Sequence, residues 1–274
     1  MIAGTAVILS GCGGAPPAPP AAEKKDPAAE TVLPAGTPVE RTRIFVSPVS
    51  KETFRIDTVK GGLEAEAADV PATTPDVITT PPGAPQTDYY AGTARKAAKL
   101  SIAIARTENF GDVSAMIATI PSMNAMVNHK PVITTTANSN RVNEEKRNVR
   151  LAAFLYAASH EDDNDFHLIL GRAPAAVPQV YFTAEVSGLP PATSGSFATL
   201  KSVRDTFKNH FGLFVPTPLV GYDFYTPPIR VSIEGSLFFD MTHATGTPPG
   251  PASLRPKMPV IWEVHPVTKI VFEP

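Results

Sequence analysis

HEDDNDFHLILG, residues 160–171, joins an acidic turn to a short apolar run, and this stretch decides the fold. The four Asp and Asn residues at 162–165 stand between the apolar runs 149–158 and 166–170. Asp and Asn tolerate left-handed backbone conformations and bond to their own main chain, so this spacing predicts a hairpin turn. The two apolar runs are therefore expected to be antiparallel neighbours.

The second run indicates which side chains face the core. Phe166, Leu168 and Leu170 alternate with Asp165 and His167, which is the period of a strand with one buried face. We expect the first three side chains to be buried and Asp165 and His167 to point outward. A buried, neutral histidine is the alternative interpretation of His167.

The order of the predicted elements on both sides of this hairpin indicates the fold class. A helix with one apolar face is expected before Gly212, a Pro-rich rigid connection at 216–228, and a bulge at Gly235 in the next strand. The elements are strands at 149–159, 166–171 and 180–186, a helix at 196–211, and strands at 229–240 and 260–272.

Three strands, one helix and two strands is the order of the OB-fold. The predicted fold is mainly β: a five-stranded OB-fold-like Greek-key barrel with one helix between strands 3 and 4, preceded by a Pro-rich, largely disordered N-terminal region. An immunoglobulin-like sandwich requires about seven strands, and a Rossmann-type unit requires alternating helices and a Gly-rich phosphate loop.

Three motifs in the same region resemble those of small, uncharacterised bacterial proteins with OB-like domains. The resemblance runs from Val149 to the end of the chain, with Asn164 at a position where those proteins usually have glycine and an Ala/Pro-rich insert at 172–178. It implies the OB-like fold and no particular activity. The motifs are an acidic turn with Asp165-x-His167-Leu168, then Phe238-Phe239-Asp240-x-x-His243, then Glu263-x-His265-Pro266-Val267.

The first residues predict a membrane anchor. Leu9-Ser10-Gly11-Cys12 follows an apolar run and looks like a bacterial lipobox, in which the cysteine is lipidated. An ordinary signal peptide with a chance cysteine, or an apolar tail, is the alternative. Since Gly13 is not the aspartate that retains lipoproteins at the inner membrane of enteric bacteria, we expect an envelope lipoprotein that is anchored in the outer membrane of a Gram-negative host.

Composition shifts divide the chain into four parts. The ranges are a signal peptide with the lipobox at 1–12, a Pro/Ala/Thr-rich tether at 13–93 with a hairpin at 41–59, an extension at 94–148, and the OB-like domain at 149–274. The extension is expected to contain a strand at 99–106 and a short helix that Asp112 caps. Of the 30 prolines, 13 lie in the first ninety residues, a higher density than in the rest of the chain.

Charge and cysteine content exclude several classes of protein. The net charge is −2, with no basic surface to hold a phosphate backbone, so nucleic acid is not an expected partner. A single cysteine excludes an internal disulfide framework.

The candidate ligand-binding residues collect at one expected mouth of the barrel. In OB-folds the loops that join strands 1 to 2 and 4 to 5 border the binding surface, and here these loops are acidic and histidine-rich. A divalent metal such as Zn, Mn or Ca is one hypothesis; turn and backbone hydrogen bonds of the same side chains are the alternative. The ligand-binding candidates are Glu161, Asp163, Asp165, His167, Asp240, His243, Glu263 and His265, and the candidate metal ligands are Asp165, His167, Asp240, His243 and His265.

These observations favour a non-catalytic binding module over an enzyme. The sequence contains no GxSxG elbow, and the one cysteine is the expected lipidation site, so no catalytic residues are assigned. The expected ligands are glycans, peptides or other envelope proteins. A metal-dependent, phosphodiesterase-like hydrolase is the second hypothesis, and a binder of single-stranded DNA the third.

Overall fold

The computed structural model describes residues 33–63, 88–244 and 248–274, and these residues form a mainly β structure with an eight-stranded sheet and few helices. The predicted signal peptide, Cys12 and most of the predicted tether lie outside the described residues. The strands are β1 Arg41–Val46, β2 Thr53–Lys60, β3 Thr107–Phe110, β4 Asn148–His160, β5 Phe166–Gly171, β6 Tyr181–Val186, β7 Gly221–Phe239 and β8 Trp262–Phe272. The helices are α1 Lys96–Lys99, α2 Val113–Ile117, α3 Met123–Val127 and α4 Phe197–Phe211, with short 3-10 turns at 143–145, 212–214, 241–243 and 255–257.

The strand order is β1-β2-β7-β8-β6-β5-β4-β3, and a further pairing joins β7 to β4. Five strands therefore form a closed cycle of pairings, in the order β4, β5, β6, β8, β7 and back to β4. The β6–β8 and β3–β4 pairs are parallel and the rest antiparallel. The antiparallel β4–β5 pair confirms the hairpin, and Asn164 in its turn has a φ of 75°, as an Asx residue allows.

The strand before β8 is longer than the sequence predicted. The Pro-rich connection was expected to extend to residue 228, but β7 already begins at Gly221 and includes Pro227 and Pro228. Proline has no N–H to donate, so it is tolerated where a ladder is interrupted. The β7 partner changes at this point: β2 pairs with β7 up to Thr226, and β4 shifts register between Leu155 and Ala157. Gly235 lies at a register shift between β7 and β8, as predicted.

Segments that precede residue 149 also belong to the sheet. β1 and β2 form an antiparallel pair at the predicted hairpin, and β2 extends the sheet by pairing with β7. Asp112 caps α2 by accepting a hydrogen bond from Ser114 N, as predicted, although the helix already ends at Ile117. The segment 94–148 packs on the sheet, because Val113, Met116 and Met126 belong to the main core cluster.

The predicted strand at 99–106 is wrong. Lys99 ends α1 and the following residues are irregular. Alternation of apolar residues predicted a strand, but Ile104 is fully exposed and side chains bind the backbone in place of a neighbouring strand. Ser236 Oγ accepts from Ala103 N, and Asn148 Nδ2 donates to Ala103 O.

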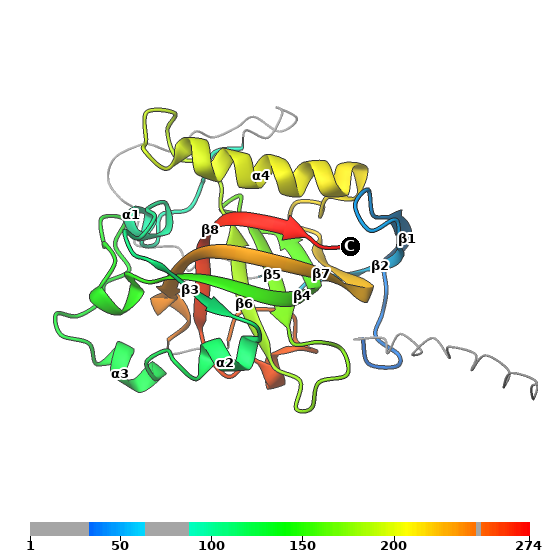
Figure 1. Ribbon diagram of the computed structural model, residues 1–274, viewed down its shortest axis with the longest axis horizontal. Coiled ribbons are helices and arrows are strands. Elements are labelled where there is room, and N and C mark those ends of the chain that lie inside the picture. Colours follow the sequence, from blue (N-terminus) through cyan, green and yellow to red (C-terminus); the bar gives the residue numbers. More distant parts are fainter. Residues whose placement is uncertain (1–32, 64–87, 245–247) are drawn as a thin grey trace, which may run out of the picture.

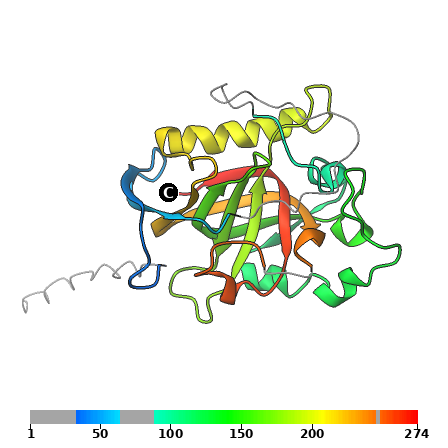
Figure 2. The same cartoon turned by 180° about the vertical axis from the view of Figure 1, so that it is seen from behind.

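α4 covers one side of the sheet and lies along β8 (Figures 1 and 2). Its Phe207 and Phe211 contact Phe272 of β8, with ring centroids 6.4 and 5.6 Å apart. Gly212, with a φ of 55°, ends the helix. Arg204 of α4 is buried in spite of its charge, and it donates to Asp88 and Asn164.

The second face of β5 is also buried, contrary to expectation. Asp165 is 0% exposed and His167 3% exposed. The period of two places both side chains on the second face of β5, but the expected exposure of that face to solvent is wrong. A second apolar cluster covers this side of the sheet, and it includes Ile169 of β5 and Leu254 and Met258 of the β7–β8 loop. Alternation within a strand separates two faces but does not reveal which of them later segments cover.

Candidate functional site

A small cavity of about 30 Å³ lies where the β4–β5 turn approaches the start of the β7–β8 loop. That volume accommodates a water molecule, an ion or the tip of a side chain, but not a whole organic ligand. The lining contains six carboxyl groups and one lysine, and we call it the acidic cavity. Its lining residues are Lys99, Glu161, Asp162, Asp163, His167, Glu185, Asp240, Thr242, His243, Pro249 and Glu263.

A larger, open hollow of about 530 Å³ shares no lining residue with the acidic cavity. It lies between α1 and the segment that precedes α4, and Lys96 is its only charged lining residue. The described groups with acid–base or ligand chemistry are concentrated at the acidic cavity, so the candidate site is placed there.

The β4–β5 turn is held by its own polar groups. Asp163 Oδ1 accepts from Asp165 N at 3.0 Å, and Glu161 N donates to Asp165 O at 2.9 Å. Asn164 Nδ2 donates to Tyr89 O, which ties the turn to the segment before α1. These bonds fix the turn so that the side chains of Glu161 and Asp163 line the cavity.

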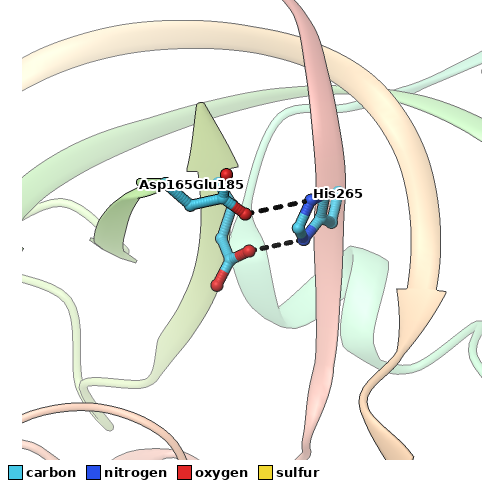
Figure 3. Close-up of side chains that lie close together, drawn as sticks. All are labelled: Asp165, Glu185 and His265. Atoms are coloured by element: carbon cyan, nitrogen blue, oxygen red, sulfur yellow. Dashed lines mark ion pairs between the residues drawn. The ribbon is translucent and has the colours of Figure 1, made fainter. Parts of the chain in front are cut away.

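Three buried groups meet behind the cavity: Asp165 directly before β5, Glu185 in β6 and His265 in β8 (Figure 3). One ligand atom from each lies within 4.8 Å of the others. The parallel register of β6 and β8 explains the meeting, because Thr183 pairs with Glu263 and Ala184 with Val264, which brings the next residues, Glu185 and His265, side by side.

The two nitrogens of His265 face different carboxylates. Nε2 lies 3.3 Å from Asp165 Oδ2 and 3.4 Å from Ser187 Oγ. Nδ1 forms an ion-pair contact with Glu185 Oε2 and lies 3.6 Å from Glu263 Oε2. Because Glu185 and Glu263 line the acidic cavity and Asp165 does not, the Nδ1 side of the imidazole is the side toward the cavity.

Burial controls the protonation of this cluster. It raises the pKa of Asp165 well above its ordinary value, and the carboxylates of Asp163 and Glu185 add to the increase. Burial also lowers the pKa of His265, more than the Glu185 carboxylate raises it. The imidazole is therefore neutral near pH 7, with one nitrogen able to donate a proton and the other able to bind a cation.

The remaining histidines of the site lie at the rim. His167 Nδ1 is 3.1 Å from the Tyr222 hydroxyl and 3.7 Å from Glu161 Oε1. His243 Nε2 contacts Asp240 Oδ2 at 3.1 Å, and both residues line the cavity. Since the Asp240 and His243 side chains contact each other, they form a pair that is separate from the buried cluster.

All eight ligand-binding candidates from the sequence lie in or directly behind the acidic cavity. Six line it: Glu161, Asp163, His167, Asp240, His243 and Glu263. Asp165 and His265 lie behind it. The five candidate metal ligands do not form one group, because within the described ranges the group with converging ligand atoms is Asp165, Glu185 and His265.

Sequence reasoning missed Glu185 and Lys99. Glu185 was passed over as part of a strand, although a single acidic residue in the otherwise apolar run 180–186 is the signal that could have identified it. Lys99 was assigned to a strand that does not form; its Nζ lies 3.3 Å from Asp163 Oδ2. Trp262 is a core residue, and its Nε1 donates to Pro121 O.

Comparison of this chain with protein-family models, curated proteins and solved structures gives no match. In the described part of the chain, every helix is too short or too polar to cross a bilayer.

Proposed function

We propose that the chain is a lipid-anchored cell-envelope protein whose C-terminal part, residues 149–274, is a non-catalytic OB-like module that binds positively charged ligands at the acidic cavity. The charge of the cavity is the observation that supports this most directly: six carboxyl groups against one lysine. A low-dielectric pocket lined by one sign of charge attracts ligands of the opposite sign. The expected ligand is a cation or the cationic end of a peptide or protein.

The strand pairings support the OB-like assignment. The five strands β4, β5, β6, β8 and β7 pair in a cycle, with β6 parallel to β8 and α4 between β6 and β7 in sequence. Five strands with the helix between the third and fourth are the arrangement of an OB barrel. The acidic cavity then lies between the two loops that border the ligand surface of OB-folds, which favours a binding role.

The proposed localisation in the cell envelope depends on the lipobox at 9–12, and Cys12 lies outside the described residues. Expression of the full-length chain in a bacterial host tests it. We expect the wild-type protein in the membrane fraction, with the mass increase of a diacylated cysteine, and the Cys12→Ser variant in the soluble fraction. Equal partitioning of both proteins would remove the anchor from the proposal.

One observation favours the alternative, a metal-dependent hydrolase. The Asp165–His265 pair beside Glu185 resembles a carboxylate–histidine arrangement that assists hydrolysis. A phosphodiesterase, however, also requires cations that face the phosphate. Lys99 is the one Lys or Arg among the lining residues, and it contacts Asp163, so the cavity favours a cationic ligand over a phosphate.

Titration with a pair of peptides tests the proposed ligand class. Acetyl-trilysine amide carries three ammonium groups, and the same peptide with acetylated side chains carries none. We expect the charged peptide alone to bind the full-length chain, and more weakly as ionic strength rises. Nuclear magnetic resonance shifts should locate the contact at the acidic cavity.

Two double variants control for net charge. Asp162→Asn with Asp240→Asn removes two carboxylates from the cavity and should weaken binding about tenfold, equivalent to about 1.4 kcal/mol. Glu108→Gln with Asp205→Asn removes two carboxylates that contact Arg147 and Lys201 elsewhere, and should leave binding unchanged. Equal binding of both peptides, or equal losses in both double variants, would refute the proposal.

A further inference from the structure

The imidazole of His265 is fully buried, and its Nδ1 is in ion-pair contact with Glu185 Oε2 and 3.6 Å from Glu263 Oε2. These contacts lie on the side of His265 that faces the acidic cavity. Ligand atoms of Asp165, Glu185 and His265 all lie within 4.8 Å of one another. A buried imidazole with converging carboxyl groups beside a cavity is an arrangement that can hold a metal ion.

We propose that a divalent transition-metal ion binds at the buried end of the acidic cavity, held by His265 Nδ1 and the carboxylates of Glu185 and Glu263. This inference rests on the proposed function, because it names the cation that the deepest part of the cavity takes. Imidazole with carboxylates is a ligand set suited to Zn²⁺ or Mn²⁺.

The opposite side of the imidazole provides the support that metal-binding histidines require. Asp165 Oδ2 is 3.3 Å from His265 Nε2, so Nε2–H can donate to this carboxylate while Nδ1 binds the ion. Gly188 N donates in turn to Asp165 Oδ1 and fixes that carboxyl group. A carboxylate behind a ligating histidine sets its tautomer and orientation. Asp165 is therefore a positioning residue.

A second contact fixes the backbone of His265. Arg141 NH2 donates to His265 O at 2.6 Å, and Arg141 NH1 donates to Leu237 O on the neighbouring strand β7. The ligand nitrogen is thus held from its backbone and from Nε2 before any ion arrives. Such preorganisation reduces the entropy that binding must overcome.

Charge and size also agree with an ion. Asp165, Glu185 and Glu263 contact the single imidazole of His265, so carboxyl groups outnumber the base three to one. A divalent ion would offset the repulsion among them. The cavity volume of about 30 Å³ fits one ion with a water molecule, and Glu185 and Glu263 line the route by which it enters.

The test uses the full-length chain with Cys12→Ser, which removes the only thiol and leaves all six histidines. After removal of bound metal with a chelator, Zn²⁺ and Mn²⁺ are titrated by calorimetry. We expect one ion per chain. Nitrogen-15 spectra of the histidine rings with Zn²⁺ should shift Nδ1 of His265 and leave its Nε2 protonated.

Variants assign the ligands. Glu185→Gln and Glu263→Gln should each lower the Zn²⁺ affinity at least about tenfold, and Asp165→Asn about 10–100-fold with the ion still on Nδ1. Glu234→Gln, which removes a carboxylate that pairs with Arg150 outside the cavity, is the matched control and should change the affinity less than about threefold. Urea unfolding of each variant without metal shows whether it is folded; Zn²⁺ should raise the unfolding midpoint of the parent chain and not that of Glu185→Gln.

Three results would overturn the inference: neither ion binds at submillimolar concentration, the Zn²⁺ shift appears on Nε2 of His265 or on another histidine, or Glu234→Gln loses as much affinity as Glu185→Gln. The two proposals can fail separately. Trilysine binding without metal binding would refute the metal site and leave the cationic-ligand proposal standing, whereas loss of both would refute the acidic cavity as a site.

Discussion

Glu145→Gln should be among the most destabilising single substitutions that preserve side-chain shape. Glu145 is completely buried, and each of its carboxylate oxygens accepts two hydrogen bonds. Oε1 accepts from Arg95 NH1 at 2.6 Å and Phe239 N at 2.9 Å. Oε2 accepts from Arg95 NH2 at 2.9 Å and Val142 N at 2.8 Å. A glutamine amide must therefore turn its NH₂ group toward two other donors, whichever way it is oriented.

The magnitude follows from the loss of the charge. Arg95 is 1% exposed, and without an anion its guanidinium becomes an uncompensated buried charge. Breaking a buried ion pair at one partner costs about 3–5 kcal/mol. With a urea m-value of about 2 kcal/mol per molar, this lowers the unfolding midpoint by about 1.5–2.5 M.

Urea unfolding followed by circular dichroism measures this shift. Glu234→Gln is the matched control, since Glu234 pairs with Arg150 at an exposed position and should cost less than about 1 kcal/mol. Adding Arg95→Met to Glu145→Gln removes the orphaned charge, so the double variant should be less destabilised than the sum of the single variants. Equal losses in Glu145→Gln and Glu234→Gln, or strict additivity in the double variant, would show that the Arg95–Glu145 ion pair does not carry this stability.

Two further predictions concern stability. His210 stacks on Phe272, and burial lowers its pKa to about 4. Between about pH 6.5 and pH 4 the unfolded state therefore binds a proton at His210 and the folded state does not. His210 should consequently lower the free energy of unfolding as the pH falls through this range. His210→Phe should remove this dependence, which urea midpoints at pH 7 and 4.5 would measure; an unchanged pH dependence would contradict it. Gly235→Ala should destabilise the protein by about 1–3 kcal/mol, because the added Cβ would lie 2.4 Å from Pro266 O. Gly111→Ala, with open space around the added Cβ, should be nearly neutral in the same urea assay. Similar effects of the two substitutions would argue against close packing at the bulge.

Local patterns predicted the order of strands around the hairpin because each depends on neighbours in sequence. Asn164 identified a turn, the alternation of Phe166, Leu168 and Leu170 identified the buried face of β5, and Gly212 marked the end of α4. The register of β6 against β8 depends on residues about eighty positions apart, and no local pattern encodes it. The approach of Glu185 to His265 therefore cannot be predicted from the sequence.

The burial of Asp165 and His167 shows the same limit from another side. The period of two placed them opposite the core, and that placement is right. Their exposure depends on whether a second layer covers the face, and Leu254 and Met258 of the β7–β8 loop belong to that layer. A polar residue on the second face of a strand can therefore mark a buried site as well as a solvated surface.

The burial itself is the strongest physical argument that the acidic cavity serves a ligand. Removing a carboxylate from water is costly unless charges and hydrogen bonds offset it, and mutual repulsion increases that cost. Asp165 is fully buried beside His265, and burial together with the neighbouring Asp163 and Glu185 raises its pKa, so the protein groups around Asp165 do not fully offset its desolvation. Apolar side chains of similar volume would fold with less penalty, as replacements of buried ion pairs often show. A cation bound in the adjacent cavity would reduce this cost, which is the property that the proposed site requires.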